Sequence, residues 1–169
     1  MDFSYSKTEE LFLQMIRSFA ENEVKPLAAE IDEQERFPIE TVNKMAKLGL
    51  MGIPVPKQYG GAGGSVQMYI MAVEELSRAC ATTGVVLSAH TSLCVAPILE
   101  HGTEEQKMKY LPKLASGEWI GAFGLTEPNA GTDAAMQQTT AVDAGDKWIL
   151  NGTKIFITNA SNADVFIVM

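Results

Sequence analysis

Cysteines and basic residues are the scarce components of this sequence. Among 169 residues only two are cysteines, Cys80 and Cys94, and their spacing is not that of metal ligands. We expect no metal site, and we expect both cysteines to be free thiols rather than a disulfide, typical of a reducing intracellular compartment. Lys and Arg total 13 against 21 acidic residues, so the formal net charge is -8. This balance argues against nucleic acid as a partner, because phosphate backbones are bound by clustered Lys and Arg.

Formal charge is also missing between Ala79 and Leu99, a run long enough to raise the question of a membrane span. Polar or helix-breaking residues interrupt this run at Thr82, Thr83, Gly84, Ser88, His90, Thr91, Ser92 and Pro97. We therefore expect no membrane span but a central buried helix, which could also form the wall of an internal pocket. The sequence does not begin with a basic stretch and an apolar run, so no signal peptide is expected.

Capping signals and apolar periodicity predict five helices in the first part of the chain. Their expected extents are about 6–26, 38–49, 65–81, 85–101 and 103–113. In the third helix, Val66, Ile70, Val73 and Leu76 are expected on the inner side, and Glu74, Glu75 and Arg78 on the solvent side. A break at 82–84 should separate the third helix from the fourth. Short connections between the helices predict a compact α domain.

After residue 117 the pattern changes to short runs of β-branched and aromatic residues between turn formers. Strands are expected at 119–125, 137–142, 147–150, 153–158 and 164–169. Asn151 and Gly152 predict a hairpin between the third and fourth of these, because both residues tolerate positive φ. The sequence thus predicts an α+β protein, with an all-α helical domain over 1–118 and a β domain starting at 119–169. Because the last run is an apolar strand with no closing turn, we expect a fragment with an incomplete β domain.

The stretch 122–133 combines the groups that hold a large, flat, anionic cofactor. A short apolar strand leads to Thr126, and a turn at 128–129 follows. Gly131 would let the backbone approach a ligand closely. The hydroxyls of Thr126 and Thr132 lie beside backbone N–H groups suited to phosphate or ring-carbonyl oxygens. On spacing alone, an ordinary strand and turn explains these residues equally well.

Two ordered segments resemble a known family. Residues 124–133 (Gly-Leu-Thr-Glu-Pro-Asn-Ala-Gly-Thr-Asp) look like the signature loop of the acyl-CoA dehydrogenase flavoproteins, and 154–159 (Lys-Ile-Phe-Ile-Thr-Asn) resembles the second flavin-contacting segment of that family. The likeness covers the whole chain and is strongest to the butyryl-CoA or short-chain members. It implies an N-terminal α domain, then the first part of an antiparallel β-barrel-like middle domain, with the family's C-terminal helical bundle absent from this chain.

The resemblance also implies a binding site for FAD. One wall would consist of Phe123, Leu125, Thr126, Gly131 and Thr132, with Thr132 close to the pyrophosphate or the acyl-CoA substrate as well. The second wall would consist of Phe156, Ile157 and Thr158. The ring of Phe156 would pack on the flavin, at a position where many relatives have Trp. The hydroxyl of Thr158 would point toward the flavin. Without the resemblance, Phe156 and Ile157 could equally be core residues of a central strand.

The implied reaction is FAD-dependent α,β-dehydrogenation of short-chain acyl-CoA thioesters, with electrons passed to an electron-transfer flavoprotein. The catalytic base is a Glu in the C-terminal bundle of most relatives, so no catalytic residue is assigned here and the isolated chain is expected to be inactive. Glu127 should fix the turn by accepting backbone N–H bonds or pairing with a cation. His90 should be a hydrogen-bonded core or pocket histidine, and Asp133 should cap or brace the loop.

Two alternatives stay open at this point. The chain could be a non-catalytic fragment or binding module that needs a partner chain, or it could belong to an acyl-CoA oxidase, in which reduced flavin reacts with oxygen. By resemblance, the full-length protein would be a homo-tetramer. Its expected location is the bacterial cytoplasm or, as the second choice, the mitochondrial matrix.

Overall fold

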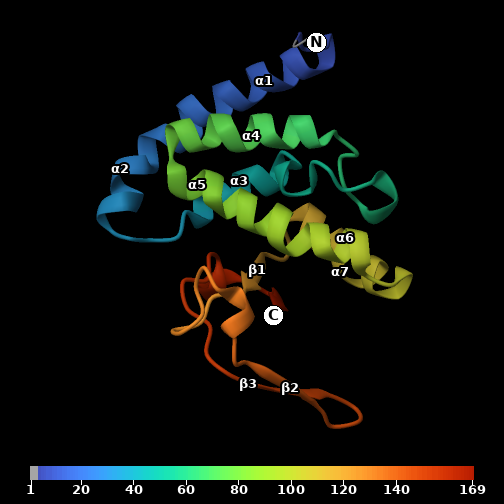
Figure 1. Cartoon of the computed structure of the whole chain (residues 1–169). Helices are drawn as coiled ribbons and strands as arrows, with labels where there is room; N and C mark the ends of the chain where they lie inside the picture. The colour runs from blue at the N-terminus through green and yellow to red at the C-terminus, as the bar shows by residue number, and fades with distance from the viewer. Residues whose placement is uncertain (1–3) are drawn as a thin grey trace.

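The computed structural model describes residues 4–169; residues 1–3, part of the stretch in which no signal peptide is expected, lie outside the described residues. The helical elements are α1 (Lys7–Phe19), a π-helical turn (Ala20–Val24), α2 (Lys25–Glu33), α3 (Ile39–Lys47), α4 (Val66–Ala79), α5 (Ala81–Ser88), a π-helical segment (Ala89–Val95), α6 (Ala96–His101) and α7 (Glu104–Ser116). Five helical runs stack on one another, with α1 on α4 and α4 on α5, and the strands lie on the far side of α5 from α4 (Figure 1).

Two of the predicted helix starts, at Ser6 and Thr103, are confirmed by their capping boxes. The Ser6 hydroxyl accepts from the Glu9 N–H at 3.3 Å while the Glu9 carboxylate accepts from the Ser6 N–H at 2.8 Å. Thr103 and Gln106 form the same reciprocal box at the start of α7. Each box satisfies backbone donors that the first helical turn leaves unpaired.

The junction between α4 and α5 differs from its prediction. The break lies at Cys80, whose φ of -155° and ψ of 110° are extended, and not at 82–84. Gly84 instead lies inside α5, and a Cβ there would be 1.9 Å from the Ser77 hydroxyl oxygen. Glycine is therefore needed because the two helices approach closely, not because the chain turns.

The faces of α4 are only partly as predicted: Val73 and Leu76 pack in the core and Glu74 and Arg78 are exposed, but three other residues differ. Val66 and Ile70 are 67% and 54% exposed, whereas Glu75 is 8% exposed. The Glu75 carboxylate is 3.0 Å from the guanidinium of Arg17 on α1, and a partner supplied from 58 positions away makes its burial tolerable.

The run Ala81–His101 forms a core helix. By length and composition it could cross a membrane, since it has 21 residues and a mean hydropathy of 1.4, yet 56% of its most apolar window is buried inside the structure. His90 and Cys94 within it are fully buried, and the π-helical segment packs against strand β1 (Gly121–Gly124). The prediction of a buried central helix agrees with this packing.

The described strands form two small sheets rather than one. Strand β1 pairs in parallel with β4 (Val165–Val168), and β2 (Thr140–Asp143) pairs antiparallel with β3 (Trp148–Asn151). The antiparallel prediction therefore holds for β2 and β3 only, and a barrel stays a prediction. The β2–β3 hairpin extends away from the helices (Figure 1).

The predicted hairpin at Asn151 and Gly152 is wrong. Asn151 lies within β3, opposite Thr140, and the hairpin turn lies earlier, where the Ala144 N–H donates to the Lys147 carbonyl at 2.9 Å. The segment 153–158, predicted as a strand, has no strand structure. It crosses instead to the end of β1, which places it at the site described next.

Candidate functional site

A pocket of about 310 Å³ lies between the π-helical segment, the end of β1 and the segment 156–158. Its volume is within the range of small-molecule sites. Its lining residues are Ala89, Leu93, Phe123, Leu125, Thr126, Phe156, Ile157 and Thr158. The structure thus brings together six of the eight residues named from the sequence as cofactor contacts, and it places Thr126 and Thr158 in one cavity.

The first wall of the pocket is positioned by the packing of β1 on the core helix. Ala122 is fully buried, while Phe123 is half-buried and lines the pocket, as expected for successive residues of a strand. At Gly121 a Cβ would be 2.5 Å from the Cβ of Cys94. Only glycine lets the strand lie this close to the helix.

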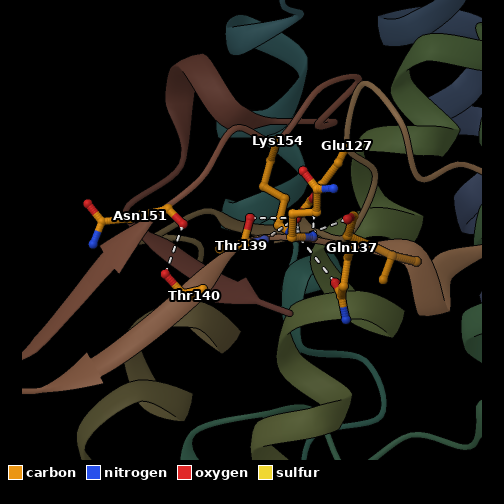
Figure 2. A network of polar contacts seen from close by, with 8 residues as sticks. Glu127, Gln137, Thr139, Thr140, Asn151 and Lys154 are labelled. Atoms are coloured by element: carbon orange, nitrogen blue, oxygen red, sulfur yellow. Dashed lines mark hydrogen bonds and ion pairs between the residues drawn. The ribbon is translucent and has the colours of Figure 1, made fainter.

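Glu127 connects the two walls of the pocket (Figure 2). Its Oε1 accepts from Lys154 Nζ at 2.8 Å and from the Thr139 N–H at 2.9 Å, and its Oε2 accepts from the Gln138 N–H at 2.6 Å. Lys154 Nζ also donates to the Leu125 carbonyl at 2.9 Å. Both predicted roles of Glu127, the backbone acceptor and the ion-pair partner, are confirmed.

These contacts change the acidity of Glu127. Hydrogen bonds from Lys154 first, and then from Thr139 and the Gln138 backbone, lower its pKa from 4.5 to about 2. A carboxylate with this pKa and with both oxygens occupied is a structural anion. It is a poor candidate for a general base.

The turn after Glu127 lies outside the pocket. Glu127 and Ala130 exchange two backbone hydrogen bonds of 3.0 and 3.1 Å, which close the turn. Gly131 and Thr132 beyond it are exposed and do not line the cavity. The side chain of Asp133 makes no capping bond to the short 3₁₀ turn Ala134–Met136 that it precedes, so its predicted capping role is wrong.

The second wall has an unusual backbone. The Ile155 N–H donates to the Thr126 carbonyl at 2.9 Å, which joins the two walls directly. Phe156 then adopts a φ of 57° and is 89% exposed, and Asn159 adopts a φ of 70°. A left-handed conformation is costly for an aromatic residue and, where it occurs, is often associated with function. Phe156, Ile157 and Thr158 all line the pocket, and Phe156 is the most exposed of the three.

His90 is on the same π-helical segment as the pocket residues Ala89 and Leu93, and it is fully buried. Its Nδ1 accepts from the Gly121 N–H at 3.0 Å, which confirms the prediction of a hydrogen-bonded core histidine. Burial lowers the pKa of His90 to about 4, and the nearby carbonyls of Met51 and Leu114 partly offset this effect. The imidazole is therefore neutral at physiological pH.

The two cysteines are both free and buried, as predicted. Burial raises the pKa of the Cys94 thiol to about 11, so this sulfur is an inert part of the packing.

Sequence reasoning missed four residues that build this site. Ala89 and Leu93 line the pocket, while Lys154 and Asn159 hold its second wall. The spacing of Ala89 and Leu93, four apart in a charge-free helix, was a signal for a shared face. Lys154 and Asn159 lie in the motif 154–159, but the motif gives neither side chain a role, because their partners are distant in sequence.

Comparisons with known proteins agree with this geometry. Residues 6–118 match the family model described as acyl-CoA dehydrogenase, N-terminal domain, and residues 122–169 match the model of the acyl-CoA dehydrogenase middle domain. The chain therefore belongs to the acyl-CoA dehydrogenase family, a family of oxidoreductases, and the resemblance seen in its sequence is confirmed.

Three similar proteins illustrate the match. The short-chain specific acyl-CoA dehydrogenase of Clostridium acetobutylicum is 66% identical over 168 residues, covering 99% of this chain and 44% of that protein. The structure of butyryl-CoA dehydrogenase from Megasphaera elsdenii has a TM-score of 0.93 at 44% identity, covering 99% of this chain and 45% of that one. An acyl-CoA dehydrogenase from Bacillus anthracis, solved in complex with FAD, has a TM-score of 0.91 at 38% identity, covering 98% of this chain and 29% of that one. The chain thus spans less than half the length of these relatives.

Proposed function

We propose that this chain is the N-terminal and part of the middle domain of an FAD-dependent acyl-CoA dehydrogenase that acts on short-chain acyl-CoA thioesters. The domain division lies at residues 118 and 119. The observation that carries the proposal is the shared pocket, in which Phe123, Leu125 and Thr126 face Phe156, Ile157 and Thr158. Two segments about thirty residues apart would have little reason to converge there if each were only a turn and a strand.

The walls of the pocket fit a flat, largely apolar ring with polar edges. Phe123, Leu125 and Ile157 supply apolar surface, and Thr126 and Thr158 supply hydroxyl groups at its sides. Phe156 is a large aromatic side chain that is 89% exposed and held by a strained backbone. Stacking on a ligand ring would bury it and explain why the strain is kept.

The residues of the chain would bind and orient FAD and acyl-CoA. The bound FAD would supply the acceptor for the β-hydrogen of the acyl-CoA, taken as hydride, and the electrons would go on to an electron-transfer flavoprotein. The exposed Gly131 and Thr132 lie at the turn where a pyrophosphate or the CoA moiety would be held by backbone N–H groups. The hydroxyl groups of Thr126 and Thr158 would stabilise charge on the bound ring.

The base that removes the α-proton lies outside this chain in our proposal. No acidic residue is among those lining the pocket in the described part of the chain, and Glu127 is held in its ion pair. The isolated chain should therefore bind FAD without dehydrogenating a substrate. In the complete protein we propose a homo-tetramer in the bacterial cytoplasm, with the mitochondrial matrix as the second choice.

Titration of the purified chain with FAD, followed by flavin fluorescence, tests the proposal. Saturable binding is expected, and Phe156→Ala should weaken it by about tenfold, since stacking on a base or ring is worth roughly 1 to 3 kcal/mol. Phe166→Ala in β4 is the matched control, because Phe166 is 45% exposed but lies outside the pocket. If the wild-type chain does not bind FAD, the result favours the alternative that the chain is a non-catalytic binding module. In a longer form with activity, oxygen consumption with butyryl-CoA would indicate an oxidase.

A further inference from the structure

Gly121, the first residue of β1, has both of its backbone polar groups bonded to side chains. On one edge of β1, the carbonyls of Ile120 and Gly124 accept from the N–H groups of Val165 and Met169. The N–H and carbonyl of Gly121 face the other edge, where no strand pairs with β1 in the described chain. His90 Nδ1 accepts from that N–H, and Asn159 Nδ2 donates to that carbonyl at 3.0 Å.

The amide of Asn159 joins three separate elements. Its Nδ2 also donates to the carbonyl of Val86 at 3.2 Å, so one buried NH₂ group bridges α5 and β1. Asn159 is 6% exposed, and its Oδ1 has no partner among the described residues. The two hydrogen bonds to main-chain carbonyls are thus the bonds that hold this side chain in place.

The position of Asn159 gives this bridge a consequence for the pocket. Thr158, which lines the cavity, precedes Asn159 directly, and Lys154 and Ile155 fasten the other end of the segment to the first wall. The segment 156–158 therefore spans two fixed ends, and the end nearest Thr158 depends on Asn159. Its φ of 70° explains the residue type, since Asn is tolerated in the left-handed region and also provides two donors.

We propose that Asn159 is a positioning residue of the FAD site: by bridging the carbonyls of Val86 and Gly121, it holds Thr158 and Phe156 in register with the first wall. This inference rests on the proposed function. Asn159 does not line the pocket, so it acts through the residues that do. The bridge also explains how a segment without strand pairing keeps a defined shape beside the cavity.

The substitution Asn159→Gly tests the inference, because glycine accepts the left-handed backbone and removes only the amide. FAD binding should weaken about tenfold or more, since a 1.4 kcal/mol loss of fixed geometry gives this factor. Asn162→Ala, three residues further on, is the matched control: its amide donates only to the adjacent Ser161 hydroxyl at 2.9 Å, and binding should not change.

A double-mutant cycle separates positioning from general stability. If Asn159 acts through Thr158, Asn159→Gly should cost much less FAD affinity in a Thr158→Ala background than alone. Additive effects of the two substitutions would overturn the inference. If the wild-type chain binds FAD and Asn159→Gly binds it equally well, the inference fails while the proposed function stands. If the wild-type chain binds no FAD, both fail.

Asn159→Asp gives a second route if the glycine variant does not fold. An ionised aspartate donates no hydrogen bond, but burial raises its pKa, so the protonated acid, which regains one donor, becomes more populated as pH falls toward about 5. FAD affinity of this variant should rise as pH falls, while that of the wild type stays constant. His90 and Glu127, with pKa values of about 4 and about 2, do not change charge above about pH 5. A pH-independent Asn159→Asp variant would contradict the bridge.

Discussion

Lys154 lies 2.8 Å from Glu127, and both side chains are nearly buried, 12% and 7% exposed. The pair joins two segments that are 27 positions apart and form opposite walls of one pocket. The carboxylate also accepts backbone and hydroxyl hydrogen bonds, so the pair is one part of a connected network (Figure 2). Removing one partner of such a network leaves the other charge buried and unpaired.

We expect Lys154→Met to lower the melting temperature by at least about 5 °C, because Glu127 would lose its cation in a buried setting. The matched control is Lys25→Met. Lys25 makes an ion pair of 2.7 Å with Glu21, but both side chains are more than half exposed, so its removal should change little. Differential scanning calorimetry of both variants measures the contrast, and equal melting temperatures would argue against a structural role for the buried pair.

The lowered pKa of Glu127 predicts a pH dependence of stability. Since its folded-state pKa of about 2 is below the ordinary 4.5, its stabilising contribution is complete above about pH 4.5 and is lost as pH falls toward 2. In Glu127→Gln this part of the acid-induced loss should disappear. Urea unfolding at a series of pH values measures the free energy of unfolding of both proteins. If that free energy falls equally steeply with decreasing pH in wild type and variant, the prediction is wrong.

The strained backbone at Phe156 predicts a conflict between stability and binding. Phe156→Gly should raise the free energy of unfolding by about 1 kcal/mol, because relief of a left-handed conformation exceeds the entropic cost of glycine. The ring itself makes few contacts, being 89% exposed, so Phe156→Ala should change stability by less than about 0.5 kcal/mol. Both variants should bind FAD more weakly. Urea denaturation tests the stability difference, and a less stable glycine variant would show that Phe156 is not strained.

We expect Gly121 and Gly131 to respond differently to substitution by alanine. Gly121→Ala should lower the free energy of unfolding by about 1 to 3 kcal/mol, because the new Cβ would meet the Cβ of Cys94 at 2.5 Å. Gly131→Ala meets nothing within 4 Å and should cost less than about 0.5 kcal/mol. Chemical denaturation of the two variants measures their free energies of unfolding. Similar losses of stability in both would be inconsistent with the close approach of β1 to the core helix.

The helices were predictable because their signals are local. The reciprocal bonds between Ser6 and Glu9, and between Thr103 and Gln106, involve residues three apart, and the structure shows both. The prediction failed where a distant partner decided the outcome. Glu75 is buried because Arg17 of α1 forms an ion pair with it. The apolar periodicity of the α4 sequence does not indicate this contact between two helices.

The pocket was only partly predictable for the same reason. The motif at 124–133 and the segment 154–159 contain residues that do meet in the pocket, yet the Ile and Thr content of 153–158 predicts a strand that the structure does not have. Lys154 and Asn159 override that propensity through bonds to Glu127 and Gly121, which are respectively 27 and 38 positions away.

The parallel pairing of Gly121 with Val165 constrains the order in which this molecule can assemble as it is synthesised. The helices have local backbone bonds and caps, so they can begin to form before β4 has been synthesised. Every pocket-lining residue after Phe123 lies inside the long crossover between the two paired strands. Within the described residues we therefore expect the cavity to take its final shape only after β4 has been synthesised and has paired with β1.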